Sequence, residues 1–520
     1  MGHLMSTEAS VFSSTSPRDG SMLTPVQATS AADLDALVSS AHAAQELWAA
    51  RTLEARIEAL QAFKGRLLDR GTEFARLISL ETGKPEVEAL LAEVLATGDV
   101  VEAWCTNIGG WLEDESVTLD ATSYPKKEAW ITRVPRGVVA VIMPWNYPLA
   151  LPLRTIVPAL LAGNAVVFKP SEVTPRVGAV IGECLNGLLP DGVFTVVQGG
   201  RDVGAALVGA RVDLVAFTGS VAAGRKVAVA CAERFVPCSL ELGGKDAAIV
   251  RADADLDRAA SGIAWGAFTN AGQNCAAIER VYVHASVADA FLAKLVATVK
   301  GLSPRADMGT LTTEAQLAVV RRHFDEAVAK GAEVLTGGTA EGLYFAPTVL
   351  RVTNDDCAAV REESFGPLLP VMVVASDEEA SAKANDCRYG LTGSIWTRDE
   401  RAAERMAAKL RTGVVTVNNH SFTGAIPLLP WTGVGETGTG VTNSHFALDH
   451  LTRPRAVLVD RNKAPRELWW MPYGTALEAI ARALLTLKRP GASIGQKLAA
   501  VVALLTHLPK RWKGLPLPKA

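Results

Sequence analysis

The chain has 520 residues, of which 49% are hydrophobic and 21% charged, and its formal net charge is -3. This composition suits two or three packed domains and excludes both a mainly disordered chain and a nucleic-acid footprint over the whole chain. Seven cysteines in a chain of this length do not make a dense disulfide framework, which favours a reducing compartment such as the cytoplasm.

Residues 1–29 are expected to be a flexible N-terminus, in which Gly2 to Leu4 resemble the remnant of a tag before a native Met5. No secretory signal is visible there. An uncharged, mainly apolar run of 16 residues extends from Val138 to Leu153 and contains three prolines. Because a membrane span needs roughly 20 apolar residues, we expect a soluble main body without a span.

Residues 30–115 and 134–240 are predicted to form one α/β domain. A capped helix begins after Ser30, and four short apolar runs then alternate with helical segments, at 138–142, 165–168, 193–197 and 214–217. This alternation is typical of a parallel, Rossmann-type sheet that is covered on both faces. Ligands of such sheets bind at the carboxyl ends of the strands, where we therefore look for motifs.

Residues 241–445 repeat the alternation of strands and helices and predict a second α/β domain. Its expected strands lie at 247–250, 281–283, 370–374 and 414–417. Two segments, 116–133 and 446–460, are peripheral to both domains. We interpret them as edge strands for pairing with another subunit.

The tail, residues 461–520, differs in charge from the rest of the chain. It holds 11 basic and two acidic residues, a charge of +9, which leaves -12 on residues 1–460. Apolar residues recur at helical spacing on both sides of Pro490-Gly491, which predicts two amphipathic helices. Two interpretations remain open: the helices dock on the acidic body or a neighbouring subunit, or they lie on an anionic membrane surface.

Three residues near strand ends are candidates for catalysis. Cys275 follows a polar Gly-Gln-Asn segment, in what is predicted to be a loop entering a helix, whose amides would lower the thiol pKa. Glu241 precedes two glycines and suits a mobile general base. Asn146 lies between two prolines, and its NH₂ group can donate to an oxyanion. The alternative interpretations are a buried thiol for Cys275, an exposed turn for Glu241 and a rigid aromatic turn for Asn146.

Two further motifs suit a nucleotide. Lys169 and Glu172 follow a strand directly and can hydrogen-bond ribose hydroxyls. Gly219 and Ser220 lie between a strand and a helix, which places a pyrophosphate on helix N-terminal amides. Neither motif is the regular dinucleotide fingerprint, so each is weak when taken alone.

Taken together, the motifs resemble the aldehyde dehydrogenase superfamily over about Leu34 to Asp460. The motifs that carry the resemblance are, in chain order, PWNYP, KPSE, FTGS, ELGGK, GQNC, EESFGP and NDCRYGLTGS. The 34 residues from Glu241 to Cys275 also match the family's spacing. The resemblance implies a cofactor domain, a catalytic domain, small oligomerisation strands and a homodimer or homotetramer, and the basic helical tail is an addition.

The resemblance also implies roles for individual residues. Cys275 would attack the aldehyde and pass through a thiohemiacetal and a thioester, Asn146 and the Cys275 N–H would hold the oxyanion, and Glu241 would activate the hydrolytic water. The residues that the resemblance assigns to the cofactor are Trp145, Lys169, Glu172, Gly219, Ser220, Gly243, Glu363 and Phe365. A carboxylate at Glu172 repels a 2′-phosphate and favours NAD, whereas Lys169 nearby leaves NADP open.

The substrate is predicted only by class. The candidate pocket residues are mostly aromatic and include no Arg or Lys: Tyr147, Trp265, Phe268, Asn274, His420 and Phe422. This favours an apolar aliphatic or aromatic aldehyde, and no metal site is expected. The glycine motif near Gly435 and Glu436 departs from the family's pattern, which puts the substrate class in doubt. The alternatives are a dehydrogenase that transfers the acyl group to coenzyme A, and a non-catalytic, membrane-associated scaffold.

Overall fold

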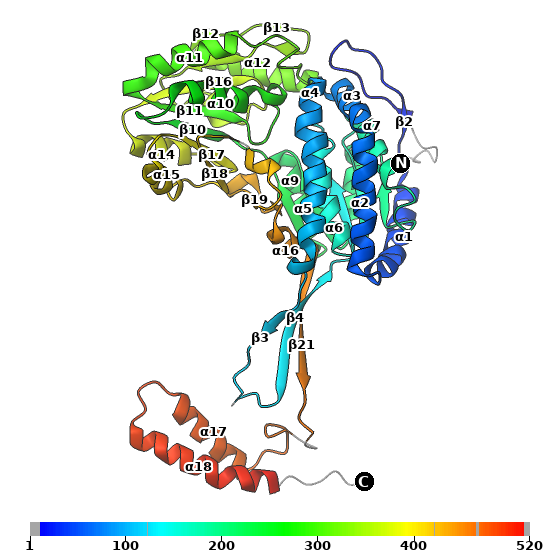
Figure 1. Cartoon of the computed structure of the whole chain (residues 1–520), viewed down its shortest axis with the longest axis vertical. Coiled ribbons are helices and arrows are strands. Elements are labelled where there is room, and N and C mark those ends of the chain that lie inside the picture. The colour runs from blue at the N-terminus through cyan, green and yellow to red at the C-terminus, as the bar shows by residue number, and fades with distance from the viewer. Residues whose placement is uncertain (1–10, 122, 421, 464–466, 514–520) are drawn as a thin grey trace, which may run out of the picture. The chain divides into compact units, whose positions relative to one another are not determined.

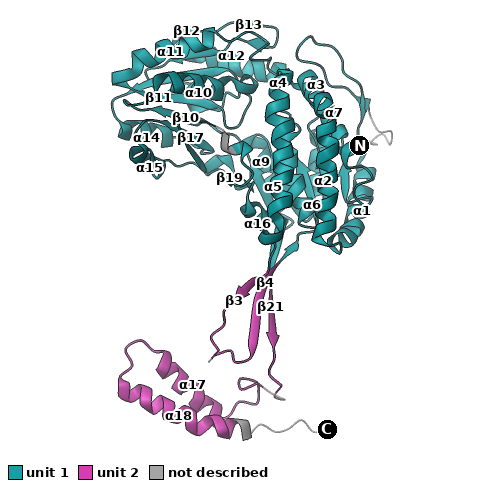
Figure 2. Ribbon diagram, viewed as in Figure 1, with its two compact units in different colours: residues 1–113, 133–455 teal, residues 114–132, 456–520 magenta. Residues whose placement is uncertain are grey.

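The computed structural model describes residues 11–121, 123–420, 422–463 and 467–513 (Figure 1). The chain divides into two compact units (Figure 2). Unit 1 comprises the residues up to Glu113 together with Arg133–Arg455, and unit 2 comprises Asp114–Thr132 and the residues from Ala456 onward.

A five-stranded parallel sheet forms the centre of the first α/β domain in unit 1. Its order is β7(Phe194–Val196), β6(Ala165–Lys169), β5(Val138–Ile142), β8(Leu214–Thr218) and β9(Cys238–Glu241). Every residue of β5 and β6 is buried. The strands are continuous apolar runs because helices cover both faces of the sheet. The predicted parallel sheet is confirmed, with β9 added to the four expected strands.

Helices pack on both faces of this sheet and form a separate hydrophobic core on each face. Leu34, Val38 and Ala41 of α1 pack on one face. Helices α2, α5, α6 and α7 cover the other. The helices of this domain are α1(Ala31–Ala49), α2(Leu53–Asp69), α3(Gly71–Thr82), α4(Glu86–Ala89), η1(Leu90–Leu95), α5(Ala96–Trp111), α6(Ala150–Leu161), α7(Pro175–Leu185), α8(Arg201–Gly209) and α9(Val221–Ala232).

The second sheet of unit 1 has seven strands. Its order is β12(Glu333–Thr336), β15(Thr348–Arg351), β16(Leu368–Val374), β11(Ile278–His284), β10(Asp246–Val250), β17(Thr392–Trp396) and β18(Val414–Val417). All neighbours are parallel except β12 and β15. The helices around it are α10(Leu256–Phe268), α11(Ala288–Lys300), α12(Glu314–Ala329), α13(Ala358–Arg361), α14(Asp377–Asn385) and α15(Glu400–Ala407).

Unit 2 contains most of a third sheet and the tail. The sheet has the order β21(Thr452–Asp460), β4(Lys127–Pro135) and β3(Glu115–Val117). Two tail helices follow, α17(Thr475–Lys488) and α18(Ile494–Lys513), so the predicted pair of helices is confirmed. Among the described residues, no helix combines the length and hydrophobicity that crossing a membrane requires.

The N-terminal segment differs from the expectation of flexibility over residues 11–29. β1(Val11–Phe12) pairs with β2(Val26–Gln27), and the Ser14 hydroxyl donates to the buried carboxylate of Glu81 at 3.2 Å. The segment is therefore held by polar contacts to unit 1. Its sequence has no apolar run because its anchor is a hydrogen bond rather than a hydrophobic face.

Candidate active site

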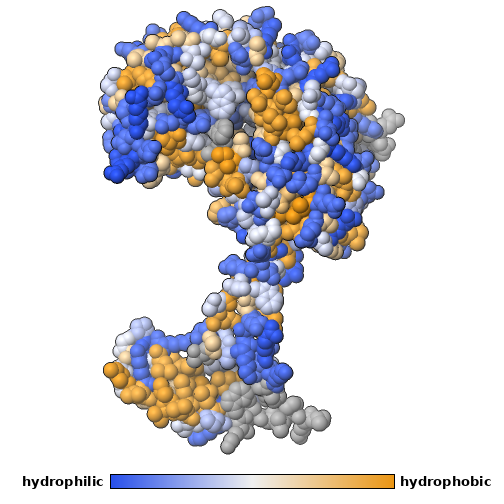
Figure 3. All heavy atoms as spheres, in the orientation of Figure 1, coloured by the Kyte–Doolittle hydropathy of each residue, from blue (hydrophilic) through white to orange (hydrophobic). Residues whose placement is uncertain are grey.

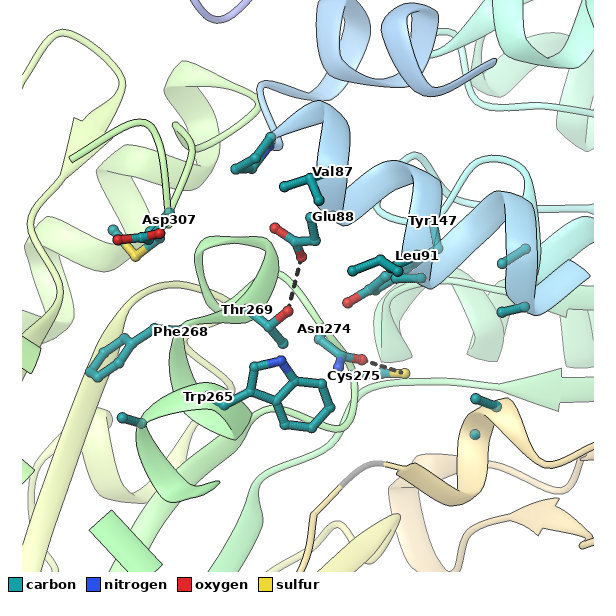
Figure 4. A pocket seen from close by; sticks show the side chains of 18 of the residues that line it. Val87, Glu88, Leu91, Tyr147, Trp265, Phe268, Thr269, Asn274, Cys275 and Asp307 are labelled. Atoms are coloured by element: carbon teal, nitrogen blue, oxygen red, sulfur yellow. Dashed lines mark hydrogen bonds between the residues drawn. The ribbon is translucent and has the colours of Figure 1, made fainter. Parts of the chain in front are cut away.

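Several of the candidate residues line a cavity of about 520 Å³ in unit 1 (Figure 4). Four of the six predicted pocket residues line it: Tyr147, Trp265, Phe268 and Asn274. Cys275 lines it as well, and its Sγ lies 3.8 Å from Asn274 Oδ1. Tyr147 follows β5, whereas Trp265 and Phe268 belong to α10, so the two α/β domains together form the wall.

Cys275 lies in a turn before β11 and not at the start of a helix, which corrects the sequence-based prediction. The three residues Asn270, Ala271 and Gly272 all have positive φ, at 51°, 54° and 71°. A side chain at Gly272 would place its Cβ 2.3 Å from the carbonyl oxygen of Gly366. Left-handed backbone at two non-glycine residues is unfavourable, so tertiary contacts must maintain this conformation.

The surroundings of Cys275 favour the protonated thiol. Burial raises its pKa above the ordinary range, and the carboxylates of Glu241, Asp246 and Glu363 raise it further. The expected lowering by helix amides is absent because no helix begins here. Nucleophilic attack therefore requires a base that removes the thiol proton.

Asn146 is anchored beside the turn that carries Cys275. Its Nδ2 donates to the carbonyl of Gln273 at 3.1 Å, and its own carbonyl accepts from Asn270 Nδ2 at 2.9 Å. Its Oδ1 is buried without a hydrogen-bond partner among the described residues. The amide group carries two protons, so one remains for a substrate oxygen after the bond to Gln273.

Glu241 ends β9, as predicted, and its carboxyl group is buried. Burial raises its pKa to about 7, although Thr442 and Arg154 act in the opposite direction. Glu241 and Cys275 line a second, smaller cavity of about 10 Å³. That space is roughly what one water molecule needs. A carboxyl group with this pKa can accept a proton from water near neutral pH.

Arg154 corrects the prediction that no cation lines the pocket. It belongs to α6 and lines the cavity, and its Nε has no hydrogen-bond partner within the described ranges. Its positive charge lowers the pKa values of Glu241 and Cys275, opposing the effect of burial. In the sequence, Arg154 directly follows an uncharged run, and nothing there indicates where its side chain points.

Buried Lys84 and Glu93 and half-buried Glu88 support the segments that carry Asn146 and Cys275, and sequence reasoning missed all three. Lys84 Nζ lies 2.6 Å from Glu93 Oε1 and donates to the Asn146 carbonyl at 3.0 Å. Glu93 Oε2 accepts from the Leu149 amide at 2.9 Å. Glu88 Oε1 accepts from the Asn270 amide at 2.6 Å. Charged residues at this spacing resemble an ordinary solvated helix face, so the sequence gives no signal.

Lys169, Glu172, Gly219 and Ser220 lie at the carboxyl ends of β6 and β8. The buried Lys169 Nζ lies 3.7 Å from Glu172 Oε2. Ser220 caps α9 and accepts from the Ala223 amide at 3.4 Å. At Gly219 a Cβ would lie 2.7 Å from the end of the Phe217 ring, so a larger residue would require this ring to move. The order of strand, glycine turn and helix is the predicted one.

Glu363, Phe365 and Gly243 come together near Trp145. The rings of Trp145 and Phe365 meet edge to face, with centroids 5.7 Å apart. Glu363 Oε1 accepts from the Gly244 amide at 3.0 Å, and a Cβ at Gly243 would lie 2.4 Å from Glu363 Oε2. Burial raises the pKa of Glu363 to about 8. Gly243 therefore permits the carboxyl group to approach the backbone closely.

Two predicted pocket residues are not placed at the cavity. His420 is completely buried, its Nε2 lies 2.6 Å from the Ala276 carbonyl, and it is not among the residues that line the cavity. Burial lowers the pKa of its imidazole to about 4. The side chain of Phe422 falls outside the described residues.

The unusual charge at Glu436 is neutralised locally. Its carboxylate forms ion pairs with Arg225 and, at 3.5 Å, with Arg388. Glu436 does not line the large cavity. The departure of this motif from the family's pattern therefore adds no charge to the cavity wall.

Comparison with known proteins identifies the family. Residues 4–457 match the Aldehyde dehydrogenase family. The chain belongs to this family. It is thus an oxidoreductase that oxidises an aldehyde with NAD(P). The match ends before the tail, so α17 and α18 lie beyond the family domain.

A relative and two solved structures illustrate the similarity. The chain is 38% identical to the 4,4'-diapolycopene aldehyde oxidase of Methylomonas sp, over 89% of this chain and 88% of that protein. The indole-3-acetaldehyde dehydrogenase AldA of P. syringae, solved with NAD⁺, is 31% identical, with a TM-score of 0.84 and coverages of 87% and 94%. PnpE of Pseudomonas sp. WBC-3, solved with nicotinamide adenine dinucleotide, is 34% identical, with a TM-score of 0.84 and coverages of 88% and 96%.

The residues of this site fit a nicotinamide cofactor. Glu363 presents a half-buried carboxyl group that suits a ribose hydroxyl donor. Lys169 and Glu172 supply a donor and an acceptor at the end of β6. Ser220 begins α9, whose N-terminal amides suit a pyrophosphate.

Proposed function

We propose that this aldehyde dehydrogenase oxidises an apolar aliphatic or aromatic aldehyde to the carboxylic acid, with NAD as the preferred cofactor. The observation that carries the proposal is the position of Cys275, which lines a cavity together with Tyr147 and Trp265. Glu241 shares a smaller cavity with Cys275, and Asn146 hydrogen-bonds the turn that carries Cys275. Relatives named for 4,4'-diapolycopene aldehyde and indole-3-acetaldehyde support large apolar substrates.

In the proposed first step, the Cys275 sulfur attacks the carbonyl carbon after its proton has passed to a base. The Asn146 NH₂ group and the Cys275 N–H donate to the developing oxyanion. The nicotinamide cofactor, when bound, supplies the acceptor for two electrons and a proton in the form of hydride. Loss of hydride from the thiohemiacetal carbon leaves the acyl group on Cys275 as a thioester.

In the proposed second step, Glu241 takes a proton from a water molecule in the small space that it shares with Cys275. The hydroxide attacks the thioester carbon, the C–S bond breaks, and the proton held by Glu241 passes to the leaving sulfur, which releases the acid and the free thiol. Glu241 supplies a base for water beside Cys275, which a transfer to coenzyme A would not need, so its position favours hydrolysis. The convergence of three reactive groups also argues against a non-catalytic scaffold.

The negative charge of Glu172, near the expected position of the ribose, favours NAD over NADP. Glu172 is partly exposed beside Lys169 and can accept from a 2′-hydroxyl. The same carboxylate would repel a 2′-phosphate. The solved relatives with NAD⁺ or nicotinamide adenine dinucleotide agree with this preference.

We also propose a homo-oligomer that works in the cytoplasm. The three-stranded sheet ends at β21 on one side and at β3 on the other, and such edges offer unpaired backbone groups to another copy. All seven cysteines are free thiols in the structure, which suits a reducing compartment.

The proposal is tested by following NADH formation with Glu241→Gln and wild type. Wild type should turn over steadily, whereas Glu241→Gln should release about one NADH per active site and then slow by about 10²-fold or more, because the thioester persists. Cys275→Ala should show neither phase. A Glu241→Gln enzyme with wild-type steady turnover would contradict the hydrolytic role.

The substrate class is tested with straight-chain aldehydes of increasing length, benzaldehyde and succinic semialdehyde, each with NAD and NADP. We expect kcat/KM to rise with chain length and to be higher with NAD. A preference for succinic semialdehyde would instead assign Arg154 to a substrate carboxylate and overturn the apolar class.

A further inference from the structure

The helix α18 carries an apolar stripe that α17 does not cover. The two helices pack through buried Leu477, Ile480, Ala483 and Ala500. The stripe consists of residues with 42% to 80% of their side-chain surface exposed, namely Ile494, Leu498, Val501, Val502 and Leu505. Their spacing of four, three, one and three residues places them on one face of the helix. Apolar surface gathers on this hairpin in Figure 3.

An aromatic loop adds to this apolar surface. It contains Trp469, Trp470, Met471 and Tyr473, all 45% to 72% exposed. The buried guanidinium of Arg511 donates to the carbonyls of Leu468 at 3.2 Å, Pro472 at 2.7 Å and Trp470. These bonds fix the loop at the C-terminal end of α18, so it is held on the hairpin.

The hairpin is also strongly basic. The tail carries a charge of +9, and the exposed cations Lys488, Arg489, Lys497 and Lys510 lie along or at the ends of the two helices. Arg482 is paired with Glu478 at 2.9 Å. A helix with an apolar stripe, basic residues beside it and nearby Trp and Tyr has the features of helices that lie in a membrane interface.

We propose that the hairpin of α17 and α18 is a docking surface for an anionic lipid bilayer. The α18 stripe and the aromatic loop enter the headgroup region, while the surrounding cations meet the lipid charges. Neither described helix can cross the bilayer, so the contact is peripheral. The hairpin supplies all of these features itself, whereas docking on a second copy would need a matching apolar face. This inference goes beyond the proposed oxidation and does not depend on it.

The test is flotation of the full-length enzyme with vesicles of phosphatidylcholine alone or mixed with phosphatidylglycerol. Wild type should float with the anionic vesicles, less with the neutral ones, and less again at high salt. Leu498→Glu with Leu505→Glu should lower the bound fraction on anionic vesicles by about tenfold or more.

The matched control is Gln496→Glu with Thr506→Glu, which adds the same charge at exposed polar positions of α18 that are not part of the stripe. It should retain most of the binding, and circular dichroism should show unchanged helix content in both variants. Wild type that stays unbound, or equal flotation of both variants, would overturn the proposal. A lower oligomer mass of the stripe variant without vesicles would overturn it too, because a second copy would then cover the stripe. Oxidation of a short aldehyde reports separately on the catalytic function.

Discussion

At the scale of single residues, the balance between burial and Arg154 sets the proton chemistry of the site. Burial raises the pKa of Glu241 to about 7, and the Arg154 charge opposes that effect. The carboxylate form is needed as a base, so activity should rise as the pH increases through about 7. The same cation also favours the thiolate of Cys275. One side chain therefore promotes both deprotonated forms.

Removing this charge should move the pH dependence. With Arg154→Met, the Glu241 carboxyl stays protonated to higher pH, so the rising limb of the kcat profile should move upward by about one pH unit. Arg154→Lys keeps the charge and should lie closer to wild type. The measurement is kcat against pH with one soluble aldehyde, and identical profiles for Arg154→Met and wild type would refute the electrostatic role.

At the scale of elements, the buried pair of Lys84 and Glu93 joins the segment before α4 to η1, and both side chains hydrogen-bond the loop after β5. Lys84→Met leaves the Glu93 carboxylate buried without its cation and should lower the free energy of unfolding by about 3–5 kcal/mol. Lys84→Met with Glu93→Leu removes both charges and should recover much of that loss. Urea unfolding measures both effects, and a double variant as unstable as the single one would contradict this account.

The elements also show what a sequence can and cannot predict. The strands β5, β6 and β8 were predictable because helices cover both faces of their sheet, which requires continuous apolar runs. The catalytic motifs followed at the strand ends for the same topological reason. The turn before Cys275 was not predictable, since nothing in an Asn-Ala pair indicates left-handed backbone that distant contacts maintain. Likewise, Lys84 meets Glu93 and Asn146 only through tertiary packing.

At the scale of the whole molecule, the charges are divided along the chain. Residues 1–460 carry -12, whereas the tail carries +9. Anionic lipid repels the former and attracts the latter, so a membrane would select the tail rather than the catalytic part. The family match ends at residue 457, so the catalytic chemistry and the basic hairpin occupy separate stretches of the sequence. Because of this separation, substitutions can alter the hairpin without altering the catalytic part, and the reverse.

The last prediction concerns the edge strand β21, which precedes the tail and is exposed along most of its length. Leu458, whose side chain is 58% exposed, would be covered by another copy if the edge pairs. Leu458→Glu places a charge in that contact and should lower the mass measured by light scattering to that of a smaller species. The variant Leu498→Glu with Leu505→Glu serves as the control and should keep the wild-type mass. If Leu458→Glu keeps the wild-type mass instead, β21 is not the assembly edge, and the copies meet elsewhere or the chain is a monomer.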